Sequence, residues 1–440
     1  MKNFIKKIMP GFISDLYYYL LVLVGAFIYG FPSREMIVVG VTGTNGKSTV
    51  VEMIARILEE AGYKTASLSS IKFKIGEKEW LNMLKMTMPG RFAIQKFLSQ
   101  AVKAGCKYAV LEITSEGIKQ FRHKFIKFDG AVFTNLSPEH IESHRGYDNY
   151  RKAKEKLFEV AKGIHIINVD DKNAEHFLKY RAENKYGYGI KSYESKIKEV
   201  KIVKAEDVKT TESGVSFIVH GSLFIIPLMG GFNAYNALAA VCVGLWRGIS
   251  LEICKKALEK ITAVPGRMEI VARDPFMVVV DYAHTPAALL NVYKTLSNLK
   301  SQISNLKNTN RNSKLICVIG SCGGGRDKWK RPVLGKLAAQ YCDETIITNE
   351  DPYDENPTEI IEQVANGAEN ISINQSNPYK SVIYKILDRK EAIKKALELA
   401  KPGDSVIITG KGCEPWICVA NDKKIPWDDR QIVRDELAKK

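Results

Sequence analysis

Short apolar runs alternate with amphipathic stretches along most of the chain. The first run, "MIVVGVT" at residues 36–42, is rich in β-branched residues and predicts a strand. The next stretch, "VVEMIARILEEAG", has apolar residues at helical spacing and ends at Gly62, which predicts a helix. Further strand-like runs follow at "YAVLEIT", "GAVFTNLS" and "GIHIINVD". Alternation of this kind is typical of a parallel sheet with crossover helices.

The pattern changes in the second half of the chain. Residues 197–228 contain short alternating runs around Gly214 and Gly221, which predict a small antiparallel β element. After the helical stretch "NAYNALAAVCVGLWRG", a second α/β series begins near Phe276 with "FMVVVDYAH". We therefore predict an α/β protein with a P-loop-type, mostly parallel sheet domain and a Rossmann-like C-terminal domain. The expected divisions are an apolar N-terminal segment (1–35), a central domain (36–264) and a C-terminal domain (265–440).

The N-terminal segment contains an uncharged apolar run from Leu16 to Phe31. As a helix this run would be roughly 24 Å long, shorter than the roughly 30 Å hydrocarbon core of a bilayer. Its tyrosines and the lysines of the preceding "MKNFIKKIMPG" favour a helix that lies on an anionic membrane surface. A helix packed on the chain's own core explains the pattern equally well. Peripheral membrane contact through residues 1–32 is thus one of two expectations.

Composition narrows the class of protein. The 440 residues have room for two or three domains, and eight cysteines show neither a Cys-x-x-Cys pair nor zinc-ligand spacing. The net charge of +16 is dispersed, without the interleaved aromatic and basic residues of single-strand-binding proteins. No secretory signal stands out. We predict a cytoplasmic monomer with reduced thiols that binds no nucleic acid.

A glycine loop, "VTGTNGKSTV" at residues 41–50, lies between the first predicted strand and helix. The residue five before Gly46 is a valine, so the strict phosphate-loop pattern fails, but a shorter one starting at Gly43 remains. Glycines let the backbone approach an anion, the helix N-terminus supplies N–H groups, and a hydroxyl of Ser48 or Thr49 can face Mg²⁺. The alternative is an ordinary turn with an exposed lysine.

Polar residues follow several predicted strands. Glu112 ends "YAVLE", His140 lies after "GAVF", and Asp281 and His284 follow "FMVVV". Ligands of open α/β sheets bind at the carboxyl ends of the strands. We therefore predict that Glu112 and His140 are metal ligands beside the glycine loop, although His140 taken alone would be read as a structural histidine.

Eight motifs together resemble the Mur ligase family of ATP-dependent peptidoglycan peptide synthetases. The resemblance spans residues 36–437 and is greatest to members that add the third, diamino, residue to UDP-N-acetylmuramoyl-dipeptide. Family members share the shortened glycine loop. The motifs are, in order, "GTNGKST", "LEITSEGIKQFRHKFIKFDGAVFTNLSPEH", "YRKAKEKLF", "GGFNAYNALAA", "VPGRMEIV", "VVVDYAHTP", "GGGRDKWKRP" and "GKGCE".

The resemblance implies a mechanism in which ATP and Mg²⁺ convert a substrate carboxylate into an acyl phosphate, which an amine then attacks. Catalytic roles fall to Lys47, Glu112, His140 and Lys154. Lys154 corresponds to a carbamylated lysine that supports a second magnesium, and the implied metal ligands are Ser48, Glu112, His140 and this carbamate. The implied ATP-binding residues are Gly43, Thr44, Asn45, Gly46, Lys47, Ser48, Thr49, Asn233, Asn236, Arg267, Asp281 and His284.

The resemblance also assigns the two other substrates. Thr87, Ser115 and Arg122 fall where the family contacts the muramoyl-peptide precursor. A free diamino acid would meet Arg326, Glu350, Asp351, Tyr353, Gly410 and Glu414.

Three departures bear on the substrates. Only some 35 residues precede the first predicted strand, so we expect the family's uridine-binding domain to be missing. "TSE" replaces Ser-Ser-His, and Cys413 replaces a histidine. Where members that use meso-diaminopimelate have Asp-Asn-Pro-Arg, this chain has "EDPY", with Tyr353 in place of the arginine and Asp351 in place of the asparagine. We therefore predict L-lysine or L-ornithine over meso-diaminopimelate, unless Lys330 or Arg331 replaces the arginine.

The leading hypothesis is thus a ligase that adds a diamino acid to a muramoyl-dipeptide cell-wall precursor. Two alternatives remain: a similar ligase for a lipid-linked or UDP-free acceptor, and a noncatalytic ATP-binding scaffold at the membrane.

Overall fold

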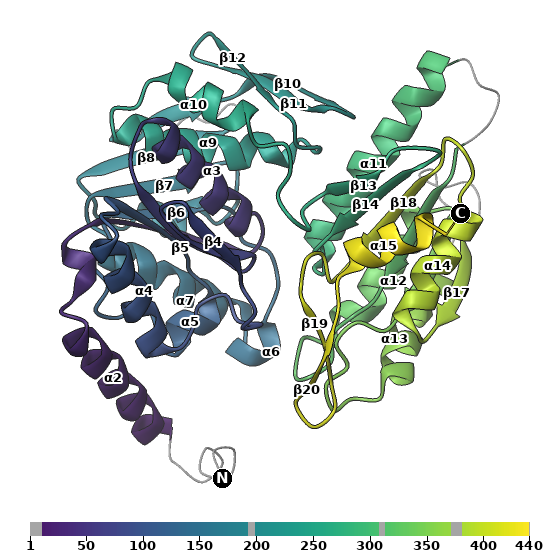
Figure 1. Cartoon of the computed structure of the whole chain (residues 1–440), viewed down its shortest axis with the longest axis horizontal. Helices are drawn as coiled ribbons and strands as arrows, with labels where there is room; N and C mark the ends of the chain where they lie inside the picture. The colour runs from purple at the N-terminus through teal and green to yellow at the C-terminus, as the bar shows by residue number, and fades with distance from the viewer. Residues whose placement is uncertain (1–10, 192–198, 308–312, 371–380, 440) are drawn as a thin grey trace.

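The computed structural model describes residues 11–191, 199–307, 313–370 and 381–439. Figure 1 shows two α/β lobes side by side, with the N-terminal helix projecting from the first. We call elements β1 to α10 the central lobe and elements β13 to α15 the C-terminal lobe. The predicted α/β class is confirmed.

The central lobe is built on a nine-stranded sheet in the order β4-β3-β2-β5-β1-β6-β7-β8-β9. The seven strands β2, β5, β1, β6, β7, β8 and β9 pair parallel with one another, and β3 and β4 form an antiparallel edge beside β2. The strands are β1 (Ile37–Thr42), β2 (Thr65–Leu68), β3 (Lys72–Ile75), β4 (Lys78–Leu81), β5 (Tyr108–Glu112), β6 (Gly130–Phe133), β7 (Ile164–Asn168), β8 (Asn184–Gly189) and β9 (Lys201–Lys204).

Helices cover both faces of this sheet. Successive strand residues point to opposite faces, so neighbouring apolar residues pack in two different cores. Val39 packs in the core under α3 (Lys47–Glu60), α9 (Phe232–Trp246) and α10 (Leu251–Glu259). Its neighbour Val38 packs in the opposite core, under α4 (Arg91–Lys103), α7 (Tyr147–Val160) and α8 (Ala174–Leu178). Burial on both faces explains why these strands read as nearly continuous apolar runs. Two short helices, α5 (Ser115–Lys119) and α6 (Ile141–His144), lie near the strand ends.

The predicted antiparallel element is a three-stranded sheet of β10 (Glu206–Thr211), β11 (Gly214–Val219) and β12 (Ser222–Ile226). It is shorter than predicted. Strand β9, which we placed within it, instead pairs parallel with β8. Val203 of β9 is buried in the core beneath α9, so packing assigns this strand to the large sheet.

The C-terminal lobe contains a six-stranded sheet in the order β13-β14-β18-β15-β16-β17, in which only β13 is antiparallel to its neighbour. The strands are β13 (Glu269–Ala272), β14 (Met277–Asp281), β15 (Leu315–Ile319), β16 (Glu344–Thr348), β17 (Val382–Ile386) and β18 (Ser405–Thr409). A hairpin of β19 (Trp416–Val419) and β20 (Lys423–Pro426) follows.

Helices cover both faces of this sheet as well. One face packs against α11 (Pro286–Lys307), α12 (Lys330–Tyr341) and α13 (Pro357–Glu369). The other packs against α14 (Arg389–Leu399) and α15 (Asp429–Leu437). Arg389 and Asp429 form a buried ion pair at 2.7 Å, which fixes α15 against α14.

The predicted N-terminal helix is α2 (Gly11–Ile28), which is followed by a short 3₁₀ turn (Pro32–Arg34). Val22 and Ala26 are buried where α2 packs on α4, and Tyr19 makes edge contacts with Phe121 and Phe125. One side of α2 therefore packs on the chain's own core, as the second of our two expectations required. The N-terminal lysines lie outside the described residues. Among the helices the structure describes, none is long and apolar enough to cross a membrane.

Candidate active site

A cavity of about 1140 Å³ lies between the two lobes. The carboxyl ends of β1 and β5 open onto it from the central lobe, and those of β14 and β16 open onto it from the C-terminal lobe. All the predicted site residues except Gly43 and Gly410 line this cavity. The structure thus brings together side chains from distant parts of the sequence.

The glycine loop connects β1 to α3. Gly46 has a left-handed φ of 84° and precedes Lys47, the first residue of the helix. The lysine is not exposed: its ammonium donates to the Thr44 carbonyl at 2.8 Å and lies 3.8 Å from Glu112. Burial lowers the pKa of Lys47 although Glu112 opposes the shift. The alternative of an ordinary turn with an exposed lysine therefore does not fit.

Asn135, which the sequence analysis missed, holds the loop in shape. Its side chain accepts from the Asn45 backbone N–H and donates to the Asn45 carbonyl, both at 3.0 Å. Its carbonyl accepts from the Thr44 N–H at 2.8 Å. The signal in the sequence was its position just after the β6 run "GAVF", where side chains face the site.

Two of the predicted metal ligands lie in direct contact. Ser48 Oγ donates to Glu112 Oε2 at 2.7 Å, and the Ser70 N–H donates to the same oxygen at 2.9 Å. Oxygen donors of this kind fit Mg²⁺. Among the described residues, no three His, Cys, Asp or Glu side chains surround one position that could hold a metal ion. A magnesium ion here would therefore need Ser48 Oγ, the Glu112 carboxylate and further donors from the substrate or from across the cavity.

His140 lies across the same cavity and begins α6 with a left-handed φ of 56°. Burial lowers the pKa of His140 to about 2, and the nearby guanidinium of Arg326 adds to the shift. The imidazole is therefore neutral, the form that can donate an electron pair to a metal. Its Nδ1 lies 3.4 Å from Arg326, so it also contacts the C-terminal lobe.

Lys154 is buried on α7 behind the glycine loop. Its ammonium donates to the Gly43 carbonyl at 2.6 Å and lies 4.5 Å from the centre of the Tyr150 ring. Burial lowers the pKa of Lys154 well below its ordinary value, and the charge of Lys47 adds to the shift. Its neighbours Lys152 and Lys156 are exposed. Of these three lysines, only Lys154 lies against the glycine loop.

The predicted nucleotide-side residues fall into two groups. Asn233 and Asn236 lie together on α9, joined by a side-chain hydrogen bond of 3.0 Å, and Asn236 faces Gly46. Arg267 comes from the other lobe, and its guanidinium reaches Ser70 Oγ at 3.4 Å.

Asp281 and His284 support the backbone around Arg267. Both carboxylate oxygens of Asp281 accept backbone N–H groups at 2.6 Å, from Met268 and Ala283. His284 Nδ1 lies 2.8 Å from the Tyr282 carbonyl. Asp281 therefore positions the backbone beside Arg267, and its contact with ATP stays a prediction.

Thr87, Ser115 and Arg122 line the cavity on the central-lobe side. Arg122 donates to the Met88 carbonyl and to Gln120 Oε1, the latter at 2.7 Å. Ser115 is the first residue of α5, whose preceding Thr114 accepts the Gly117 N–H at 3.1 Å. These residues form one wall, where an elongated acceptor can reach the phosphate loop.

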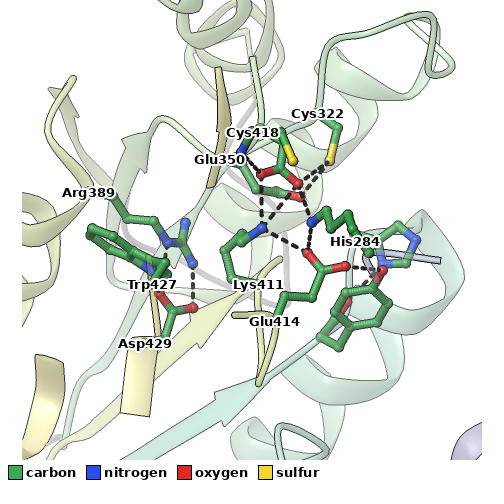
Figure 2. Close-up of polar contacts among 12 residues, drawn as sticks. His284, Cys322, Glu350, Arg389, Lys411, Glu414, Cys418, Trp427 and Asp429 are labelled. Atoms are coloured by element: carbon green, nitrogen blue, oxygen red, sulfur yellow. Dashed lines mark hydrogen bonds and ion pairs between the residues drawn. The ribbon is translucent and has the colours of Figure 1, made fainter. Parts of the chain in front are cut away.

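The predicted amino-acid residues gather around a buried lysine, Lys411, that the sequence analysis did not single out. Its ammonium donates to Asp351 at 2.9 and 3.0 Å and to Glu414 at 2.8 Å. Figure 2 shows Lys411 between Glu414 and the strand end that carries Glu350, with Cys322 above. Glu350 accepts from Cys322 Sγ at 2.8 Å, and burial raises the pKa of this carboxyl. Gly410, just before Lys411, passes close to the Glu350 side chain.

A second lysine, Lys85, reaches the same carboxylates from the central lobe. Its ammonium donates to Asp351 Oδ2 at 2.6 Å and forms a short ion pair with Glu414. Sequence reasoning missed Lys85 because it lies 266 residues from Asp351, in a segment with no motif. Two lysines and two carboxylates thus form a buried cluster that bridges the lobes.

Two assumptions behind the predicted amino-acid preference do not fit this geometry. Asp351 is neutralised by Lys411 and Lys85, so it does not repel a second substrate carboxylate as we expected. Lys330 and Arg331 are also not free to replace the missing arginine. They pair with Glu139 at 2.8 Å and with Glu355 at 3.0 Å, respectively.

The geometry is that of a two-lobed α/β protein with a glycine loop at the start of a helix and a cavity between its lobes. A model of the Mur ligase middle domain matches residues 41–244, and a model of the Mur ligase, glutamate ligase domain matches residues 266–412. The UDP-N-acetylmuramoyl-L-alanyl-D-glutamate--2,6-diaminopimelate ligase of Syntrophomonas wolfei is 38% identical over 426 residues, which cover 95% of this chain and 81% of the relative. A UDP-N-acetylmuramyl-tripeptide synthetase of a Roseiflexus species is 36% identical over 434 residues, with 94% and 81% covered.

Solved structures agree. A UDP-N-acetylmuramoyl-L-alanyl-D-glutamate--2,6-diaminopimelate ligase structure has a TM-score of 0.58 at 28% identity and covers 92% of this chain and 78% of its own. Folylpolyglutamate synthase of Mycobacterium tuberculosis has a TM-score of 0.68 at 16% identity, with 89% and 92% covered, and shares the fold. The chain belongs to the Mur ligase family, whose members are ATP-dependent amide-forming ligases.

These comparisons do not support the predicted preference for L-lysine or L-ornithine. The Syntrophomonas wolfei relative and one from Aquifex aeolicus are named as 2,6-diaminopimelate ligases. The Roseiflexus relative is named as a tripeptide synthetase, a name that specifies no amino acid. Together with the neutralised Asp351, they favour diaminopimelate.

The glycine loop gives the first test. In a Gly46→Ala variant the new Cβ would lie 2.5 Å from Asn236 Oδ1, so either the loop or the Asn236 side chain must move. We expect nucleotide affinity to fall by about tenfold or more, roughly 1.4 kcal/mol, in a calorimetric titration with ADP and Mg²⁺.

Gly62→Ala is the matched control. Gly62 has nearly the same φ, +85°, but a Cβ there has nothing within 4 Å. Both variants carry similar backbone strain of about 1–2 kcal/mol. If Gly62→Ala weakens ADP binding as much as Gly46→Ala does, general destabilisation explains the loss and the loop is not the phosphate site.

Proposed function

We propose that this enzyme joins a diamino acid to a muramoyl-peptide acceptor, using ATP to activate the acceptor's carboxylate. One observation carries the proposal: a single cavity is lined by the glycine loop, the Arg122 wall and the cluster around Lys411 and Glu414. Activation and amide formation need these three sites within reach of one another, because the acyl phosphate made at the first must be attacked from the third.

In the first step an oxygen of the acceptor carboxylate forms a bond to the γ-phosphorus of ATP. The bond from that phosphorus to the β–γ bridging oxygen breaks, and ADP leaves. Lys47 and the N–H groups that open α3 offset the charge on the transferred phosphoryl group. Ser48 and Glu112 would hold Mg²⁺ together with an oxygen of the substrate, and His140 could add a nitrogen from across the cavity. The ion would supply further charge neutralisation.

In the second step the amine of the amino acid attacks the acyl carbon, loses a proton and displaces inorganic phosphate. Arg326 lines the cavity between His140 and the Lys411 cluster, where it can bind the α-carboxylate of the incoming amino acid. That contact places the reacting amine toward the phosphate loop and the amino-acid side chain toward Glu414.

Lys154 supports the chemistry as a carbamate. Burial favours its neutral amine, and a neutral amine reacts with CO₂ to give a carbamate and a proton. The product is an anion placed directly behind the glycine loop, where it can bind a metal ion. The positive charge of Lys47, which disfavours a cation at Lys154, would instead attract this anion.

The diamino acid is 2,6-diaminopimelate. The names of the relatives support this choice, and the neutralised Asp351 removes our argument against it. The acceptor is a muramoyl dipeptide carried on UDP, as in the names of those relatives, or on a lipid.

Product formation tests the proposal. We expect ADP release to require both a muramoyl-dipeptide acceptor and 2,6-diaminopimelate, with UDP-linked and lipid-linked acceptors compared in parallel. A noncatalytic scaffold would bind ATP without such release. ADP release that is independent of the acceptor would contradict acyl-phosphate chemistry.

Lys154 gives a selective variant. Lys154→Ala should lower turnover by at least about a hundredfold while the protein remains folded by circular dichroism, because the metal-binding anion is lost. Short-chain carboxylic acids should restore part of the activity. Lys152→Ala is the matched control, since that lysine is exposed on the same helix. Undiminished turnover by Lys154→Ala would remove this residue from the mechanism.

We also propose that α2 docks the enzyme on an anionic membrane. Leu16, Leu20, Val24 and Phe27 follow one another at steps of three or four residues and are all exposed, Phe27 by 76%. They form an apolar stripe on the side of α2 away from α4. A stripe of this kind in a surface helix marks an interaction site.

Basic residues beside α2 point to a lipid surface as the occupant. Arg34 follows the helix and is exposed, and Lys127, 60% exposed, lies next to the turn because its N–H donates to Ser33 Oγ. Arg91 stacks on Tyr18 at 3.8 Å. Apolar side chains flanked by cations suit the boundary between acyl chains and anionic headgroups.

Flotation with vesicles tests this docking. We expect the full chain to float with phosphatidylglycerol vesicles and to float less with phosphatidylcholine vesicles. Leu20→Glu with Val24→Glu should abolish flotation, because the charges lie on the exposed stripe. Leu223→Glu is the control, as Leu223 is an exposed apolar residue of β12.

Two results would contradict membrane docking. One is equal flotation by the stripe variant. The other is a dimer in light scattering that the stripe variant converts to a monomer, which would assign the stripe to a second copy of the chain. The same measurement tests our prediction of a monomer.

A further inference from the structure

Lys85 is the residue through which the central lobe reaches the amino-acid pocket. We propose that Lys85 selects the amino acid by binding the carboxylate at the far end of its side chain. The inference rests on the proposed function, and it deepens that function by naming a specificity residue outside the C-terminal lobe.

The turn that carries Lys85 is held firmly in place. Asn82 Nδ2 donates to the carbonyls of Ser69 and Met86, both at 3.0 Å, and its Oδ1 accepts from the Leu84 N–H at 3.0 Å. Lys85 itself has a left-handed φ of 54°. From this turn its side chain extends into the cavity and is only 12% exposed. The position of the ammonium is therefore set by the fold.

Lys85 is available to a ligand in a way that the other cations are not. Lys411 is fully buried, and its ammonium is committed to Asp351 and Glu414. Lys330 is buried against Glu139. Arg326 lies beside His140, where it suits the α-carboxylate. Lys85 lines the cavity, and its contacts with two carboxylates among the described residues use two of its three N–H donors.

The paired charges of Lys85 and Glu414 complement the far end of 2,6-diaminopimelate. That end is a zwitterion, with an ammonium and a carboxylate on one carbon. Inserted between the two residues, its ammonium meets Glu414 and its carboxylate meets Lys85, so each charge of the broken ion pair finds a new partner. Burial lowers the pKa of Lys85, but Glu414 and Asp351 raise it above the ordinary value, and the side chain remains a cation.

L-lysine and L-ornithine lack that compensation. Each ends in an ammonium alone, which must compete with Lys85 for Glu414 and Asp351. Two ammonium groups would then share the same acceptors in a space that excludes most water, where like charges repel strongly. The pocket thus discriminates against a lone ammonium by repulsion as well as favouring a zwitterion by attraction.

The test compares wild type with Lys85→Met, which keeps an unbranched side chain only one atom shorter and removes its charge. Competing 2,6-diaminopimelate against L-lysine in one ligation reaction gives the selectivity ratio directly. We expect that ratio to fall by about tenfold or more in Lys85→Met, because a charge-assisted contact is lost for one substrate only. Lys85→Arg should retain the preference. Lys78→Met is the control, since Lys78 is an exposed lysine on β4 of the same lobe.

An unchanged selectivity ratio in Lys85→Met would exclude Lys85 from selection. If ligation of both amino acids also falls by the same factor, Lys85 only holds the lobes together. A wild-type preference for L-lysine would also overturn the inference. Calorimetric titration of each amino acid into wild type and Lys85→Met, with ADP and Mg²⁺ present, provides a readout that needs no turnover. It therefore separates failure of this inference from failure of the proposed ligation.

Discussion

Charge balance between the lobes is the constraint on which this structure depends. Lys85 from the central lobe and Lys411 from the C-terminal lobe together offset Asp351 and Glu414 in a largely buried space. Removing one member would leave an uncompensated buried charge, which is costly. The lobes therefore meet in a definite arrangement, and the cavity between them has definite walls.

Smaller contacts reinforce this arrangement around the cavity. Asp327 of the C-terminal lobe accepts the N–H groups of Ile141 and Glu142 at the start of α6. Trp416 donates to the Met83 carbonyl at 3.2 Å, two residues before Lys85. Because His140 precedes α6 and Lys85 follows Met83, these contacts hold two residues of the cavity wall in place. The contacts that hold the two lobes together therefore also position residues of the cavity.

The sequence predicted much of the fold because the central strands of both large sheets are buried on both faces. Such strands read as apolar runs, and Glu112 and Asp281 are the last residues of two of them, at the edge where ligands of parallel sheets bind. Strand β9 was misassigned because a short strand at a sheet edge has too few buried residues to show its partner.

Local patterns predicted the phosphate loop, whose residues are neighbours in the chain, but not the partners that reach it from elsewhere. Asn135 and Lys85 have ordinary sequence surroundings, and only tertiary packing brings them to Asn45 and Asp351. The expectation for the amino acid, which the comparisons do not support, has the same origin. It treated Asp351 as a free charge, since the sequence could not show which cations surround it.

The two ends of the cavity show how partners set the state of a buried lysine. At the phosphate end, Lys154 has a carbonyl and an aromatic ring as neighbours, and burial lowers its pKa. At the amino-acid end, Lys411 is equally buried, yet Glu414 and Asp351 raise its pKa above the ordinary value. One fold therefore lowers the pKa of a buried lysine at the glycine loop and raises the pKa of another beside Asp351 and Glu414. The two pKa values differ because Asp351 and Glu414 lie directly against Lys411, whereas no carboxylate pairs with Lys154 among its described contacts. Charge pairing thus decides the direction of the pKa shift at each buried lysine.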